Sequence, residues 1–397
     1  MLLNLSRLER NMDAEGLDAV IATGAENVTY LSGFWALPQW IRPGPQAYAV
    51  WPRADAETRS SVITSSGTLD LIADQNVWAA RVARYGEFAV EVGADVENDL
   101  TSRRLAEMQS LREHASPVEA LAAELEELGL RKARIGLDLS GLSPGYLEQL
   151  SAKCPQASFI DAQPLFRSTR SVKSPSEIER LRRVGKVAEI SVEAALAVAR
   201  AGITEIEMAR VFHEKTVRED TLPILGCIGF GERSALMNVQ PSQRSLRPDD
   251  IIRFDVGGRY QHYRADIARI ASFGEPSSGL RSQYAALRAG VEHGASIVRP
   301  GLSASELFGE IMRAVQDAGL DRYRRNHVGH GIGLDGYDSP LLAPGSKDVL
   351  EEGMVLCIET PFYMIGSYGL QVEDMFVVTG QGAERLTSSG DIRVIAP

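Results

Sequence analysis

Hydrophobic and polar positions in the first 170 residues follow a pattern that predicts helices alternating with strands. Residues 2–15 carry apolar side chains at the spacing of an amphipathic helix. Short apolar runs bounded by turn residues predict buried strands in LDAVIATG, AYAVWP and RIGLDLS. A stretch rich in Glu, Ala and Leu predicts one long helix around 102–130. This order of elements indicates an α/β layer domain.

The rest of the chain contains one pattern twice. Thr204 stands three residues before Glu207, and Ser303 stands three residues before Glu306, so both pairs fit a capping box at a helix start. A longer helical pattern precedes each pair and strand patterns follow it, over 176–200 and 225–273 in the first copy and 280–298 and 327–379 in the second. We therefore predict two related halves with a binding site at their seam.

The two parts of the chain join in FRSTRSVKSPSEIERLRR. Ser174–Pro175 predicts a turn, and a helix is expected to begin at Pro175 or Ser176, with Glu177 in its first turn.

Two carboxylates lie on a predicted strand, turn and strand unit at residues 251–269. Asp255 interrupts an apolar strand, Asp266 follows it, and Gly257–Gly258 predicts the reversal between them. A buried, unpaired carboxylate costs several kcal/mol or more unless a cation, hydrogen bonds or a proton compensates it. The sequence therefore predicts a compensating partner elsewhere in the chain.

Further ligand-type residues stand downstream in equally apolar surroundings. NHVGHGIGLDGYDSP carries His327 and His330 among glycines, while Glu359 and Glu373 interrupt two apolar strands. Each of these side chains alone is more often structural. Taken together, one imidazole and four carboxylates match two divalent cations of the Mn, Co, Zn or Fe type, the set being Asp255, Asp266, His330, Glu359 and Glu373.

The composition of the chain limits the classes of partner that it can bind. The net charge of −11 argues against nucleic acid and anionic membranes, and favours a small molecule or a short peptide. The early charges of the N-terminus do not fit a signal peptide, and no run is long enough to span a membrane. Cys154, Cys227 and Cys357 are expected to be buried free thiols, which fits a cytoplasmic protein.

The ordered motifs resemble those of the creatinase, prolidase and aminopeptidase P family. They are RLERNMDAEGLDAVIATGAENVTYLSGF, RSVKSPSEIERLRR, D-x10-D, GHGIGL, IETP and QVED. The resemblance implies an α+β protein with an N-terminal α/β creatinase-like domain at 1–168 and a pseudo-two-fold pita-bread domain at 169–397. It also implies that Asp266 and Glu373 bridge two metal ions, that Asp255 binds one of them, and that His330 and Glu359 bind the other.

The activity that this resemblance implies is that of a dinuclear metal-dependent hydrolase. A metal-bound hydroxide would attack the amide carbonyl of a small substrate, with Glu359 or His327 handling the proton. The family's sulfoniopropionate lyases are a weaker alternative, because they carry an Asp where this chain has Gly257. A non-catalytic peptide-binding relative is a further alternative, although it would not need the five ligands.

Three positions differ from the family's Xaa-Pro dipeptidases and aminopeptidases, which carry His there. These positions hold Asn238, Asn326 and Tyr337, and His262 replaces a Gly. Asn and Tyr can donate hydrogen bonds but cannot protonate a leaving amine at neutral pH as His⁺ does. We therefore favour a non-peptide amide substrate, as in the ectoine hydrolase branch, and keep the Xaa-Pro peptidase as the alternative, with these four residues as candidate substrate contacts.

An aromatic and Pro-rich stretch, residues 33–46, completes the candidate site. In this family a loop of the N-terminal domain commonly reaches the active site of the partner in a homodimer. We accordingly expect a homodimer in which Trp35 and Trp40 form a hydrophobic or cation-binding wall, with a plain core role as the alternative.

Overall fold

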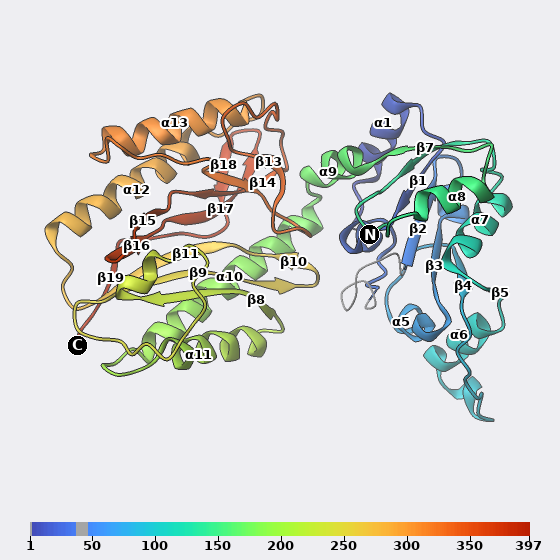
Figure 1. The fold of residues 1–397 in the computed structure, drawn as a ribbon, viewed down its shortest axis with the longest axis horizontal. Coiled ribbons are helices and arrows are strands. Elements are labelled where there is room, and N and C mark those ends of the chain that lie inside the picture. The colour runs from blue at the N-terminus through green and yellow to red at the C-terminus, as the bar shows by residue number, and fades with distance from the viewer. Residues whose placement is uncertain (1, 37–46) are drawn as a thin grey trace. The chain divides into compact units, whose positions relative to one another are not determined.

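The structure is a computed structural model that describes residues 2–36 and 47–397. The chain divides into two compact units, Met1–Thr169 and Arg170–Pro397. Figure 1 shows the elements of each unit. In the described part of the chain, no helix is both long and apolar enough to cross a membrane.

The first unit is built on a mixed sheet whose described strands run in the order β5-β4-β3-β2-β1-β6-β7. These strands are β1 (Ala19–Ala22), β2 (Ala47–Pro52), β3 (Ser61–Ser65), β4 (Arg81–Tyr85), β5 (Glu113–His114), β6 (Arg134–Leu137) and β7 (Ser158–Asp161). Its helices are α1 (Leu5–Glu15), α2 (Ala25–Ser32), α4 (Ala56–Arg59), α5 (Leu69–Asp74), α6 (Leu100–Gln109), α7 (Pro117–Glu127), α8 (Tyr146–Lys153) and α9 (Gln163–Ser171), the last of which ends in the second unit. The predicted α/β layer and its three strands are confirmed.

The single helix predicted around 102–130 is wrong. The structure has two helices there, α6 and α7, separated by β5, which pairs in parallel with β4. Ser116 accepts a hydrogen bond from the main chain of Glu119, and Pro117 occupies the first turn, so α7 has its own beginning. Both flanking segments have a helix-forming composition, and strand β5 between them is defined only by its pairing with β4.

The second unit repeats two helices followed by strands, as predicted. The first copy comprises α10 (Pro175–Ala197), α11 (Glu205–Arg218), β8 (Leu222–Phe230), β9 (Ile251–Tyr260), β10 (Tyr263–Arg264) and β11 (Ile267–Phe273). The second copy comprises α12 (Ser278–Ile297), α13 (Ala304–Asp317), β12 (Gly329–Gly331), β13 (Asp338–Leu341), β14 (Val355–Glu359), β15 (Phe362–Met364), β16 (Tyr368–Leu370) and β17 (Glu373–Thr379). Two short strands follow, β18 (Gly382–Arg385) and β19 (Arg393–Ile395). Figure 1 shows α10 beside α11 and α12 beside α13.

Matching main-chain hydrogen bonds support the internal duplication. Gly202 N–H donates to Leu246 O at 2.9 Å, and Gly301 N–H donates to Leu350 O at 2.8 Å. The two caps also form equivalent isolated bridges, Thr204 with Ser245 and Ser303 with Val349.

The predicted capping boxes differ between the copies. At Thr204 both reciprocal hydrogen bonds with Glu207 are present. At Ser303 the side chain accepts from the Glu306 main chain at 3.0 Å, and the reciprocal bond is not among those of the described residues. Ser174 forms a complete box with Glu177 at the start of α10, so the predicted beginning of that helix is confirmed.

The predicted reversal at Gly257–Gly258 is wrong. Strand β9 continues through both glycines, and the turn falls four residues later at Gln261 and His262, whose φ angles are 43° and 78°. A Cβ on Gly257 would lie 1.8 Å from the carbonyl oxygen of Ala265. Glycine is therefore required here because the strands approach closely, and not because the chain turns.

The large sheet joins the two copies through β11 and β17, in the order β10-β9-β11-β17-β14-β12-β13. Their antiparallel pairing is short and places Ala268 opposite Glu373. Behind the second copy, a buried apolar cluster that includes Leu287, Ile311 and Ile358 packs together. Each such side chain contributes roughly 1.5–3 kcal/mol through burial, which holds the strands that carry the site.

Candidate metal centre

Neighbouring strands of the large sheet bring the five predicted ligands together. Asp255 lies on β9, Asp266 immediately before β11, His330 on β12, Glu359 at the end of β14, and Glu373 at the start of β17. The pairing register sets Glu359 directly opposite Glu373. Residues from both copies therefore meet around the β11–β17 seam, as the internal repeat predicts.

The ligand atoms form two overlapping groups. Carboxylate oxygens of Asp255, Asp266 and Glu373 all lie within 4.8 Å of one another, as do ligand atoms of His330, Cys357 and Glu373. The His330 Nε2 atom is 3.9 Å from Asp266 Oδ2. Glu373 thus belongs to both groups, which is the position that a bridging carboxylate needs.

Glu359 stands outside both groups. Its Oε1 atom lies 3.1 Å from Nδ1 of His327, so its carboxylate pairs with a histidine instead. Burial alone would raise the pKa of Glu359, but His327, His330 and Arg325 together hold it below its ordinary value. The Glu359 carboxylate and the His327 imidazole therefore form a close pair beside the cluster.

Three atoms of the cluster test whether a cation fits. Asp266 Oδ1, Glu373 Oε1 and His330 Nε2 are shielded from solvent and have no hydrogen-bond partner. Leaving such polar atoms unpaired costs about 1–3 kcal/mol each. Two carboxylate oxygens and one imidazole nitrogen form a donor set suited to a divalent cation. These residues therefore fit the divalent metal ions that the sequence predicts.

Burial also shifts the protonation of the remaining carboxylates. It raises the pKa of Asp255 to about 6, with Arg253 opposing the effect. Burial, reinforced by the neighbouring carboxylates, raises the pKa of Asp266 and that of Glu373 well above their ordinary values. Raised pKa values favour carboxyl groups that keep their protons, so a cation that binds here would displace protons.

His330 is oriented for ligation by its second nitrogen. Its Nδ1 atom lies 2.9 Å from the carbonyl oxygen of Gly331, and a proton donated there leaves the Nε2 lone pair for a cation. The ring of Tyr337 stacks on the imidazole at 3.9 Å between centroids and 19° between planes. Tyr337 therefore lies beside the cluster, and its side chain is exposed.

A buried arginine supports the carboxylates, and sequence reasoning did not assign it a role. Nη1 of Arg253 donates to Asp255 Oδ2 at 3.1 Å and to Gln371 Oε1 at 2.7 Å. Gln371 in turn donates to Glu373 Oε2 at 3.1 Å, and its Oε1 accepts from the Tyr363 hydroxyl at 3.3 Å. A signal existed: Arg253 and Gln371 each stand two residues before a ligand and so share its face.

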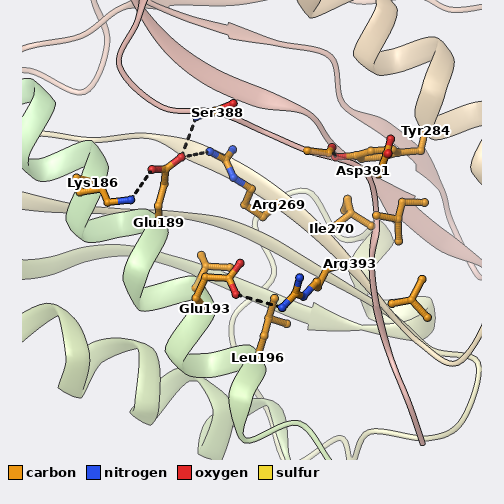
Figure 2. A pocket seen from close by; sticks show the side chains of 14 residues that line it. Lys186, Glu189, Glu193, Leu196, Arg269, Ile270, Tyr284, Ser388, Asp391 and Arg393 are labelled. Carbon is orange, nitrogen blue, oxygen red and sulfur yellow. Dashed lines mark hydrogen bonds and ion pairs between the residues drawn. The ribbon is translucent and has the colours of Figure 1, made fainter.

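The opposite face of the seam is held by ion pairs. Figure 2 shows Arg269 reaching Glu189, which also contacts Lys186 and Ser388. These residues line a cavity of about 600 Å³ that contains none of the five predicted ligands. The charged side chains that line this cavity pair with one another, so we interpret them as a structural network.

The other predicted substrate contacts do not form a cluster as the predicted metal ligands do. Asn238 and Asn326 are exposed. His262 is half-buried in the β9–β10 turn, where burial and then Arg259 and Arg180 lower its pKa to about 4. Trp35 belongs to the first unit, where its main-chain N–H donates to Gln75. Trp40 lies outside the described residues.

Comparison with known proteins decides the family. The profile of metallopeptidase family M24 matches residues 179–380, about half of the chain. The chain belongs to metallopeptidase family M24. The profile of the creatinase/prolidase N-terminal domain matches residues 4–172 of this M24 protein. Membership makes the chain a metal-dependent hydrolase, so the predicted family and enzyme class are confirmed.

Curated and solved M24 relatives cover much of its length. An Xaa-Pro dipeptidase from Lactobacillus delbrueckii subsp. lactis is 28% identical over 70% of this chain and 77% of that protein. The structure of an Xaa-Pro dipeptidase from Bacillus anthracis superposes with a TM-score of 0.79 at 24% identity, covering 98% of this chain and 99% of that one. A prolidase from Pyrococcus horikoshii OT3 gives 0.77 at 23% identity and 98% of both chains. These structural likenesses confirm the predicted pita-bread fold.

Proposed function

We propose that this M24 protein is a dinuclear hydrolase that cleaves a C–N amide bond in a small substrate. The observation that supports it is that Glu373 belongs to two groups of ligand-type residues, three of which carry a buried donor atom without a hydrogen-bond partner among the described residues. Asp266 and Glu373 would hold both cations, Asp255 one of them, and His330 with Glu359 the other. Divalent ions bound there supply water activation and carbonyl polarisation.

The protein's own residues then position and move protons. Arg253 and Gln371 hold the carboxylates of Asp255 and Glu373 by hydrogen bonds, so these ligands need little reorganisation. The Glu359–His327 pair is the candidate proton carrier, because its two groups are 3.1 Å apart and stand beside the cluster.

Metal analysis tests the dinuclear proposal. The protein is stripped with a chelator, reconstituted with Mn²⁺, and its metal content is measured by mass spectrometry. We expect about two ions per chain, and fewer than about half an ion per chain would rule out the proposal.

A second candidate, an Xaa-Pro dipeptidase, is favoured by the names of several relatives. Against it stand Asn238, Asn326 and Tyr337 at positions where peptidases of the family carry histidine. Glycyl-L-proline, alanyl-L-proline and an ectoine-like cyclic amidine should be assayed together with the Mn²⁺-loaded protein. Efficient dipeptide cleavage would establish the peptidase and show that those histidines are dispensable.

A further inference from the structure

We propose that Arg325 binds a carboxylate of the substrate and thereby selects anionic substrates. The inference rests on the proposed amide hydrolase function and adds a substrate class to it. Arg325 stands two residues before His327, on the same segment that carries His330.

The guanidinium of Arg325 has unused hydrogen-bonding capacity. Among the described residues it forms no ion pair, and its Nε atom is shielded from solvent without a hydrogen-bond acceptor. Buried donors in folded proteins nearly always have partners, and charged donors bind acceptors most strongly. An acceptor supplied by a ligand would complete this site.

Arg253 provides the internal comparison. Its guanidinium is fully buried and donates to two side chains, those of Asp255 and Gln371, and to three main-chain carbonyls, those of Ser234, Leu236 and Met237. All five of its N–H groups are therefore used in holding the fold and the carboxylates. Arg325 lacks such a set, so a purely structural explanation leaves its buried donor unaccounted for.

An aromatic ring places Arg325 at the edge of the cluster. Its guanidinium carbon lies 5.8 Å from the ring centroid of Tyr363, and that of Arg253 lies 5.3 Å from the same centroid. The Tyr363 hydroxyl donates to Gln371, which donates to Glu373. One ring therefore separates Arg325 from the residues that hold the predicted ligands, and the cation–π contact restricts its guanidinium.

The charge of Arg325 reaches the cluster and suits an anionic ligand. Its guanidinium shares the Tyr363 ring with that of Arg253, which donates to Asp255. In the metal-free protein the carboxylates of the cluster repel an anionic ligand, and the guanidinium offsets that repulsion. Its planar fork matches a carboxylate with two parallel hydrogen bonds. The carboxylate could belong to a dipeptide or to an N-acyl amino acid.

The first experiment compares two substrates that differ only in charge. Glycyl-L-proline and glycyl-L-prolinamide are assayed with the Mn²⁺-loaded full chain, in the wild type, Arg325→Gln, Arg325→Lys and Arg324→Gln. Arg324 is an exposed neighbour and supplies a matched control. We expect the wild type to favour the acid by about 10- to 150-fold, which corresponds to a hydrogen bond with a charged group.

The variants separate a binding role from a structural one. Arg325→Gln should lose the preference through a higher KM for the acid, with kcat and the amide rate nearly unchanged. Arg325→Lys keeps the charge without the fork and should retain part of the preference, while Arg324→Gln should behave like the wild type. Melting temperatures identify any variant that fails to fold. Equal cleavage of acid and amide by the wild type would refute the inference and leave the hydrolase standing.

A second measurement does not depend on turnover. The same two compounds and inorganic phosphate are titrated by calorimetry into metal-free wild type and metal-free Arg325→Lys. Tighter binding of the acid that weakens in the variant supports the inference, even if the dipeptide is never cleaved, in which case only the peptidase function fails. Binding that is equal in both proteins refutes it, as does a stronger Arg325-dependent affinity for phosphate.

Discussion

The guanidinium of Arg269 donates a hydrogen bond to the main-chain carbonyl of Glu373 at 2.8 Å. It also lies 2.9 Å from Asp374 and 3.0 Å from Glu189. This arginine therefore joins β11, β17 and α10 at the point where the two copies of the repeat meet. Successive strand residues face opposite ways, so Glu373 serves the metal side while Asp374 serves the supporting side.

We expect Arg269→Met to destabilise the protein by about 3–5 kcal/mol, because it leaves the buried Asp374 carboxylate with fewer partners. Urea unfolding of the metal-free protein measures the change. Arg182→Met removes a more exposed ion pair with Glu384 and should cost less than about 1 kcal/mol. A similar loss in both variants would contradict a special role for the seam.

Substituting either carboxylate that is proposed to hold both cations should weaken metal binding and abolish hydrolysis. In Asp266→Ala or Glu373→Ala we expect the reconstituted metal content to fall below one ion per chain, because each residue contributes to the group around the seam. Asp391→Ala removes an exposed carboxylate and serves as the control. Retained activity in Asp266→Ala would refute the ligand assignment.

Mn²⁺ affinity should decrease as the pH falls through about 6. Burial raises the pKa of Asp255 to about 6, so below that pH a proton competes with the cation. Calorimetry at pH 5.5, 6.5 and 7.5, in buffers of different ionisation enthalpy, measures both affinity and proton release. A pH-independent affinity would contradict the shift.

The raised pKa of Asp255 should also make the stability of the metal-free protein depend on pH. A carboxyl whose pKa is higher in the folded state than in the unfolded state stabilises the fold when protonated, and this contribution is lost as the pH rises through about 6. Metal-free protein should therefore show a smaller Asp255-dependent stability at pH 8 than at pH 5. Asp255→Asn removes the titration, so its melting temperature should vary less over this range.

His327→Gln should lower kcat by roughly 10²- to 10⁴-fold while metal binding persists, because the Glu359–His327 pair would lose the imidazole proposed to carry the proton. Arg324→Gln alters an exposed residue three positions before His327 and is the matched control. A flattened pH–rate profile in His327→Gln supports a proton-transfer role. An unchanged kcat would limit His327 to a structural role.

The sequence alone determined the elements whose causes are local. Periodic apolar positions located α10 to α13, and Ser174 and Thr204 marked the starts of two of these helices, because caps and amphipathic faces depend on residues within one or two turns. The ligand candidates were also visible, since an acid in an apolar strand needs compensation wherever it is buried.

Tertiary structure decided what depends on distant neighbours. The carbonyl of Ala265 requires Gly257 inside a strand, and β4 makes a strand of Glu113–His114 within a helical composition. Arg253 and Arg325 are the same residue type, each two positions before a candidate site residue. The N–H groups of Arg253 have acceptors within the protein, whereas the Nε–H group of Arg325 has none among the described residues. Close approach, pairing and hydrogen-bond saturation are properties of surroundings assembled from far along the chain, so sequence spacing could not reveal them.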